Sequence, residues 1–263
     1  MKKTTVTNKS SEFDLTLNSV INSVYQHVKI LGFKKFGRTL HRFVDGNISQ
    51  VINFQAYKPK FTINFGIGIP ECRERVFFIP TIESKYYKEY ECEIRSRIST
   101  RFLRRDTWFD TRKRASALSR KIIKELDLHV IPAFEALNNR QSILLHRSDY
   151  PYIDKMTPHQ RLLDEAFIHG AMGNIRAAEK SFWKYYDHVV KEYEMQIKQG
   201  KRIFLRKGER VVWFQQDITA EKTGYVTIHA ANHAHIDYLD ELAKELNISR
   251  ERTPTCTPES TLK

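Results

Sequence analysis

Several features that would point to a catalytic function are missing from this chain of 263 residues. Its three cysteines, Cys72, Cys92 and Cys256, are widely spaced and form no CxxC pair, which favours reduced thiols over disulfides or a cysteine zinc site. No GxGxxG, GxxxxGK[ST] or GxSxG motif is present, so nucleotide hydrolysis and serine-hydrolase chemistry lose their usual support. No complete catalytic constellation remains. We therefore favour a binding protein without a cofactor over an enzyme.

Long apolar runs are missing as well. Residues 1–11 are polar and basic, so the sequence predicts neither a secretory signal nor a transmembrane helix, and we expect a cytoplasmic protein. The hydrophobic content of 41% and the aromatic content of 12% are still sufficient to bury a core. The chain is expected to be globular.

Positive charge is abundant and is concentrated in the first half of the chain. Residues 1–140 hold 26 Lys and Arg against 14 Asp and Glu, a balance of +12, while residues 141–263 hold 18 against 17, a balance of +1. Residues 94–124 alone hold eleven basic and two acidic residues, a balance of +9. Such clusters favour polyanionic partners, because binding releases counterions from a phosphate backbone. We expect partner contacts from eight of these residues: Arg95, Arg97, Arg101, Arg104, Arg105, Lys113, Arg120 and Lys124.

Nucleic acid is the favoured partner, and the alternative is an acidic protein, as for an immunity- or regulator-type protein. A charge run often serves only to keep a surface solvated, but here the acidic residues nearby are too few to neutralise it. Nothing in the sequence predicts a membrane partner. The oligomeric state stays open.

The clearest secondary-structure pattern lies in residues 32–69. Asp45-Gly46 separates two strand-like runs and predicts a hairpin with a two-residue turn. Counting outward from this turn predicts four cross-strand pairs: Phe43 with Ile48, Thr39 with Ile52, Arg42 with Ser49, and Arg38 with Asn53. Residues 61–69 alternate apolar side chains with polar ones and glycines, which predicts a third strand whose glycines allow a close approach to the backbone.

The polar sides of these strands predict a polar shelf made of five residues: Arg38, Arg42, Asn53, Gln55 and Asn64. The simpler interpretation is the solvated face of an antiparallel sheet, and it is slightly favoured over a binding surface.

At this point the sequence resembles a known family. The resemblance is carried by GFKKFGR at residues 32–38, QVINFQ at 50–55 and FTINFGI at 61–67, and by the later Cys92, Arg97 and Trp108. Together these residues are similar to an uncharacterised bacterial family catalogued as a domain of unknown function, over roughly residues 12–130. The resemblance implies a bacterial α+β domain. It transfers no catalytic residue, because the family carries no established activity.

The sequence as a whole predicts an α+β fold: an antiparallel meander sheet with packed helices, followed by a mostly helical region with a small β-hairpin. The basic domain spans residues 1–140. It begins with a helix capped at Ser11 and holds a second helix over residues 111–128 after the strands. Residues 141–156 are predicted as a linker.

The second region spans residues 157–248. Thr157-Pro158 predicts the start of an antiparallel helical pair. A hairpin with strands at residues 210–216 and 225–229 follows, and then a last helix. Residues 249–263 have the polarity of a disordered tail.

Two patterns suggest metal chemistry, and both are weak. His229, His233 and Asp237 would lie one turn apart on a helix, but the strand predicted up to His229 breaks that face. Glu83 begins a Glu-x-Lys motif that resembles half of a metal-dependent nuclease site, but its distant possible partner, Asp45, is better explained by the turn. We predict no metal site, and a metal-dependent hydrolase or nuclease remains the third candidate function.

Overall fold

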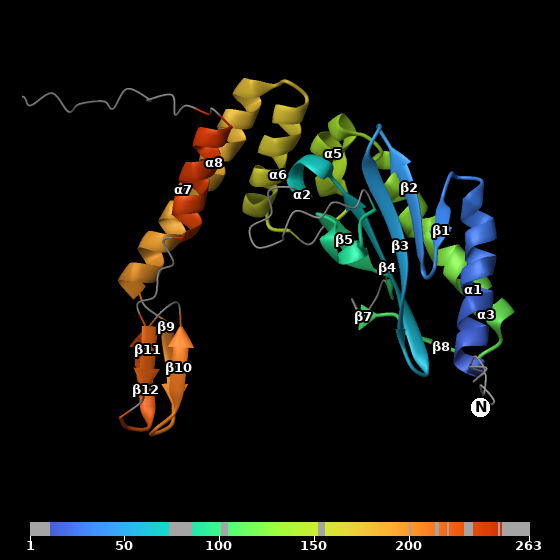
Figure 1. Cartoon of the computed structure of the whole chain (residues 1–263), viewed down its shortest axis with the longest axis horizontal. Coiled ribbons are helices and arrows are strands. Elements are labelled where there is room, and N and C mark those ends of the chain that lie inside the picture. The colour runs from blue at the N-terminus through green and yellow to red at the C-terminus, as the bar shows by residue number, and fades with distance from the viewer. Residues whose placement is uncertain are drawn as a thin grey trace, which may run out of the picture. The chain divides into compact units, whose positions relative to one another are not determined.

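The structure is a computed structural model, and the residues it describes are 11–73, 86–100, 105–151, 156–199, 201–213, 216–219, 221–228, 234–246 and 248. The chain divides into two compact units, Met1–Met156 and Thr157–Lys263. The predicted α+β class is confirmed: an antiparallel sheet with helices is followed by a mostly helical region with a small hairpin (Figure 1). Among the described residues, none of the helices has the length and apolar character needed to cross a membrane.

The sheet of the first unit is an antiparallel meander in the order β1-β2-β3-β4-β5. Its strands are β1 (Lys34–Phe36), β2 (Thr39–Val44), β3 (Ile48–Tyr57), β4 (Lys60–Gly68) and β5 (Ile94–Arg97). The short strand β8 (Phe109–Asp110) pairs with the beginning of β4. A separate two-stranded ribbon is formed by β6 (Ser99–Thr100) and β7 (Arg105–Asp106).

The two faces of this sheet differ in chemistry. The helix-covered face carries, in one row across three strands, Leu40, Ile52 and Phe65. The polar face carries, in the row beside it, Thr39, Asn53 and Asn64. The predicted alternation in the third strand is confirmed, because Phe61, Ile63, Phe65 and Ile67 are all buried.

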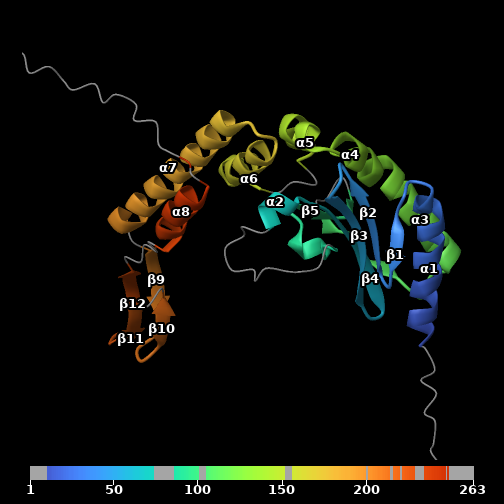
Figure 2. The same ribbon diagram turned by 45° about the horizontal axis from the view of Figure 1, so that its top comes forward.

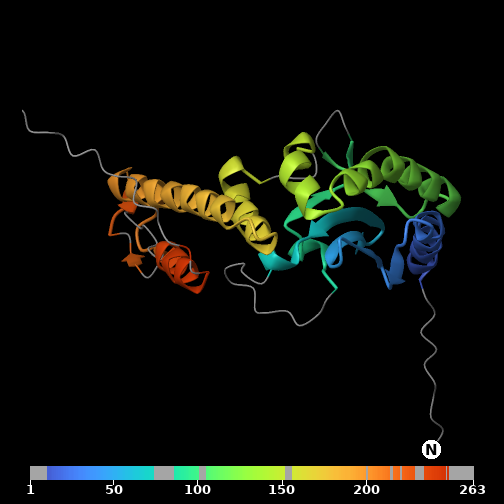
Figure 3. The same cartoon turned by 90° about the horizontal axis from the view of Figure 1, so that it is seen from above.

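Helices cover one face of the sheet because each has an apolar side. In α1 (Glu12–Lys29), Ser11 is the N-cap residue as predicted, and the buried side chains recur at helical spacing from Leu17 to Val28. α1 packs against α3 (Ala115–Glu125) (Figure 1). A π-helical turn (Leu126–Val130) then leads into α4 (Ile131–Ala136), and Figure 3 shows these green helices on one side of the strands.

The sequence predicts one helix over residues 111–128 and another over residues 132–140. The first begins later than predicted, at Ala115, and it continues through the π-helical turn directly into α4. Pro132 has no amide hydrogen to donate to the preceding turn, and the wider π turn lies immediately before it. The linker predicted at residues 141–156 is also partly wrong. It contains most of α5 (Arg140–His146) and a 3-10 turn (Arg147–Asp149), and both belong to the first unit.

The turn between β2 and β3 corrects the predicted register. It contains three residues rather than two, with Asp45 and Gly46 at φ of 46° and 80°. The observed partners include Val44 with Ile48, Arg42 with Gln50, and Thr39 with Asn53. All four predicted pairs are wrong by one residue, so the side chains of β2 lie on the opposite face from the one predicted, relative to β3.

In the second unit, the predicted antiparallel helical pair is confirmed as α6 (Pro158–Ala171) and α7 (Ile175–Gln199). Thr157 and Gln160 form a capping box at the start of α6. The last helix is α8 (Ala234–Glu245), which packs against α7 (Figure 2).

The hairpin of the second unit differs from the predicted one. β9 (Lys201–Leu205) pairs with β12 (Gly224–Ile228), and β10 (Arg210–Trp213) pairs with β11 (Gln216–Thr219). The two strand regions predicted to pair with each other, 210–216 and 225–229, therefore pair elsewhere. A turn with Gly208 at φ of 81° separates β9 from β10, and β9 was missing from the prediction.

Candidate functional site

The structure divides the basic run of residues 94–124 between the two sides of the sheet. Arg97 of β5 lies opposite Asn64 and therefore belongs to the polar face. α3 lies on the other side, because Lys121 sits over the ring of Phe109, which stacks on Phe61 of the helix-covered face. The eight predicted contact residues thus do not form one surface. Arg101 and Arg104, and the side chain of Arg105, lie outside the described residues.

The cations of α3 and its preceding turn form what we call the α3 basic face: Lys113, Arg114, Arg120, Lys121 and Lys124. All five side chains are exposed. Within the described parts of the chain, none of the five has an ion-pair partner. Arg112 differs, because it pairs with Asp110 at 2.5 Å, and its hydrogen bonds hold the pKa of Asp110 well below the usual range.

The charges at the N-terminal end of α3 are unfavourable to the helix. Its first turn contains no acidic residue, and the N-cap residue Arg114 makes no side-chain capping bond. Positive charge at a helix N-terminus opposes the helix dipole. Arg120 and Lys124 are four residues apart, and like charges at this spacing cost an isolated helix about 0.2–0.5 kcal/mol. A bound anion would relieve both effects.

On the polar face, four polar side chains lie in one row across β2, β3, β4 and β5: Thr39, Asn53, Asn64 and Arg97. Asn53 donates to the Thr39 hydroxyl at 2.9 Å, and Arg97 Nε donates to Asn64 Oδ1 at 2.7 Å. Gln55 Oε1 accepts from both Asn64 Nδ2 and Arg97 Nη2, at 2.9 and 3.0 Å. Three residues of the predicted shelf therefore come together with one arginine of the basic run.

The other two shelf residues, Arg38 and Arg42, lie elsewhere. Arg42 follows the corrected register onto the helix-covered face, where it donates to Gln50 Oε1 at 2.8 Å and pairs with Glu135 of α4 at 2.8 Å. Its side chain is only 10% exposed. Arg38 pairs with Asp14 of α1 at 3.2 Å. Both arginines connect the strands to helices, and the shelf predicted from them is wrong in composition.

The glycines of β4 allow the close approach that the sequence predicted, but the approaching group is the chain itself. A Cβ at Gly66 would lie 2.7 Å from Cys92 Cβ, and a Cβ at Gly68 would lie 2.3 Å from the Tyr87 ring. Cys92 and Tyr87 thus cover these glycines on the polar face. Beside them lies a cavity of about 380 Å³, lined mainly by Asn64, Glu89, Tyr90, Arg95, Arg97 and Asp106.

Both surfaces lie in the part of the chain that is similar to a known family model. Residues 24–136 match the family model DUF4304, which is described as a domain of unknown function. This confirms the resemblance to an uncharacterised family. The DUF4304 region runs from within α1 to the end of α4, so it holds the α3 basic face and the cavity. Neither the curated proteins nor the solved structures yielded a significant match to the chain.

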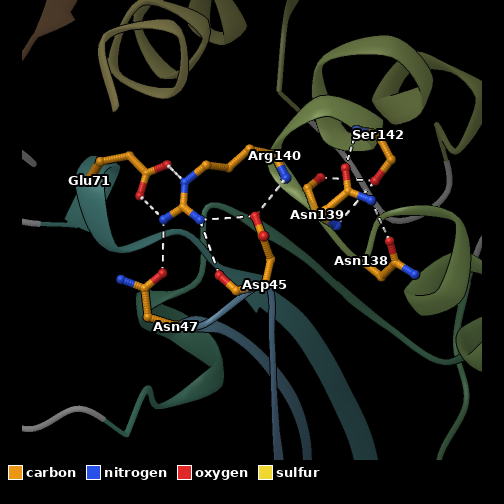
Figure 4. A network of polar contacts seen from close by, with 7 residues as sticks. All are labelled: Asp45, Asn47, Glu71, Asn138, Asn139, Arg140 and Ser142. Carbon is orange, nitrogen blue, oxygen red and sulfur yellow. Dashed lines mark hydrogen bonds and ion pairs between the residues drawn. The ribbon is translucent and has the colours of Figure 1, made fainter. Parts of the chain in front are cut away.

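Just after the DUF4304 region, Arg140 holds three elements together, a role that the sequence analysis missed (Figure 4). Its guanidinium donates to both carboxylate oxygens of Glu71 in α2 (Pro70–Arg73), at 2.8 and 2.9 Å. It also donates to the Asp45 carboxylate at 2.9 Å and to Asn47 Oδ1 at 2.8 Å. The hydrogen bonds that Arg140 donates to Glu71, followed by those to Asp45, raise the pKa of Arg140. The same contacts fix the three-residue turn.

The metal-binding patterns find no support in the described part of the chain. No group of three or more His, Cys, Asp or Glu side chains is arranged there to hold a metal ion. Asp237 lies in α8, while His229, His233 and Glu83 fall outside the described residues. The expectation of no metal site stays a prediction.

Proposed function

We propose that the DUF4304 region is a non-catalytic binding module that contacts nucleic acid through the α3 basic face. The observation that carries this proposal is a row of exposed cations without acidic partners among the described residues. A phosphate backbone carries condensed counterions, and basic side chains that neutralise its phosphates displace them. The release of these counterions into solution drives association.

The composition of this face supports nucleic acid over an acidic protein. Between Lys113 and Lys124, the exposed side chains other than the cations are Ser116 and Ala117, which are small. Stable protein interfaces are usually centred on buried aromatic or other large anchors. Phosphate contacts need only charge and reach, which long basic side chains supply. Binding through such contacts has little sequence preference.

The test is fluorescence anisotropy with labelled single- and double-stranded oligonucleotides over a range of salt concentrations. The variant Lys113→Gln/Arg120→Gln/Lys124→Gln removes three cations of the α3 basic face. We expect weaker binding and a salt dependence, in log K against log salt, that is shallower by about 3, because each lost phosphate contact removes about 1.

A matched control removes the same charge from the second unit. Lys180, Lys184 and Lys191 are exposed on α7, and their triple replacement by glutamine should leave the salt dependence unchanged. Equal weakening in both variants would show general electrostatic attraction and would refute the α3 basic face as the site. Failure of the wild-type protein to bind at low salt would refute the proposal and favour the acidic protein partner.

A further inference from the structure

The cavity on the polar face is open and polar, and it is large enough to hold a small molecule. Its volume of about 380 Å³ falls in the range of known ligand pockets, roughly 300–1,000 Å³. It lies on the side of the sheet opposite α3, so it is independent of the proposed nucleic-acid surface.

The floor of this cavity is formed by Arg97 and Asn64. Hydrogen bonds within the protein hold both side chains in place. Arg97 donates to Asn64, to Gln55 and, through Nη1 at 2.5 Å, to Asp106. Its guanidinium also lies 5.6 Å from the ring centre of Trp108. Asn64 is held in turn, because its Nδ2 donates to Glu89 Oε1 at 3.0 Å. A floor held by its own hydrogen bonds loses little freedom when a ligand binds.

The walls, in contrast, keep hydrogen-bonding capacity of both kinds. Arg95 is exposed and its Nη1 donates to the Tyr90 carbonyl, whereas its Nε and Nη2 have no acceptor among the described residues. Glu89 and Asp106 each use one carboxylate oxygen in the floor and keep the other. Tyr90 adds an aromatic ring that is 54% exposed.

Charge selects the class of ligand. The guanidinium groups of Arg95 and Arg97 and the carboxylates of Glu89 and Asp106 line the cavity. Its net charge is therefore zero, but it contains groups of both charges. A phosphate-rich ligand would meet repulsion from Glu89 and Asp106, and an uncharged one would offer no charged acceptor to Arg95 Nε and Nη2. We infer that the cavity binds a small zwitterion of the free amino-acid class. Its carboxylate contacts Arg95, its ammonium group contacts Glu89 or Asp106, and its side chain lies beside Tyr90.

The experiment uses the full chain and screens the free amino acids one by one by thermal shift, followed by isothermal titration calorimetry. We expect at least one amino acid to bind in a 1:1 ratio. Its amide, which lacks the carboxylate, and its N-acetyl derivative, which lacks the ammonium, should each bind at least about tenfold more weakly. Adenosine monophosphate serves as the phosphate-bearing probe and should not bind at this site.

Arg95→Gln should weaken amino-acid binding by at least about tenfold, because a charge-assisted hydrogen bond is lost. Arg95→Lys keeps the positive charge but lacks the planar guanidinium with its paired donors. It should reduce amino-acid affinity less than Arg95→Gln does. The control Arg112→Gln removes an exposed arginine paired with Asp110 and should change nothing. The triple variant of the α3 basic face should also bind normally, which separates this inference from the proposed function.

Three results would overturn the inference. They are no binding of any amino acid up to about 10 mM, affinity unchanged in both Arg95 variants, and tighter binding of adenosine monophosphate than of any amino acid. Circular dichroism of each variant shows whether a lost affinity reflects lost folding. If Arg95→Gln is unfolded, the comparison of the amino acid with its amide and N-acetyl derivatives decides.

Discussion

Replacing Arg140 with alanine should be among the most destabilising single changes in the first unit. The arginine side chain is 18% exposed and that of Glu71 is 14% exposed, so their charges are largely removed from water. The guanidinium makes two hydrogen bonds to Glu71, one to the Asp45 carboxylate and one to Asn47. Its removal leaves the buried Glu71 carboxylate without these hydrogen bonds. It also removes the contacts that hold the turn between β2 and β3 (Figure 4).

The expected cost follows from these contacts. Removing one partner of a buried ion pair costs about 3–5 kcal/mol, since the other charge is left uncompensated. Asp45 is 38% exposed and regains hydration, which lowers the cost. We therefore expect Arg140→Ala to reduce the free energy of unfolding by about 2–4 kcal/mol. In that background Glu71→Gln should recover about 1 kcal/mol, because a neutral amide leaves no stranded charge.

Urea unfolding followed by tryptophan fluorescence measures this cost. Trp108 is the only tryptophan in residues 1–156, so a Trp183→Phe/Trp213→Phe background makes it a reporter for the first unit. Arg112→Ala is the matched control. Its side chain is 76% exposed, and its loss should change stability by less than about 0.5 kcal/mol. An Arg140→Ala effect as small as this control would refute the reasoning.

Three further outcomes follow from the same unit. Gly68→Ala should cost about 1–3 kcal/mol in urea unfolding, because the new Cβ would lie 2.3 Å from the buried Tyr87 ring; unchanged stability would contradict this packing. Arg42→Met should lower the free energy of unfolding by about 2–3 kcal/mol, because its hydrogen bonds to Gln50 are lost, and it should leave oligonucleotide binding unchanged. Weaker oligonucleotide binding would show that Arg42 belongs to the binding surface. Burial lowers the pKa of His41, so the unfolded chain takes up the proton first and stability should fall as the pH drops through about 6.5. This fall should be smaller in His41→Gln, and equal pH profiles would contradict it.

Much of the fold could be predicted because its signals are local. The cap at Ser11 and the capping box at Thr157 satisfy amide groups within one turn, so neighbouring residues record them. The alternation over residues 61–69 reports a strand with one buried face, because side chains alternate at every residue. These periods depend only on backbone geometry. They fixed the type and order of most elements.

The composition of the candidate sites was less predictable, because side-chain alternation does not say which strand faces meet. One additional turn residue moved Arg42 from the predicted shelf to the helix-covered face. Asn53, Gln55 and Asn64 did lie together, since they come from the long pairing of β3 with β4. Arg97 joined them through β5, which pairs with β4 although more than 20 residues separate the two strands in the chain.

The sequence by itself determined the α+β class, the helical pair, the positive charge of the first half and the polar side of β4, because each is a sum or a period over nearby residues. Only the tertiary structure decided the length of the turn at Asp45. That turn is bound by Arg140, which is 95 positions away along the chain. Only the tertiary structure also divided the basic run between two sides of the sheet. Contacts between residues far apart in the chain produce no repeating pattern in a single sequence. These contacts decide which side chains lie on the same surface.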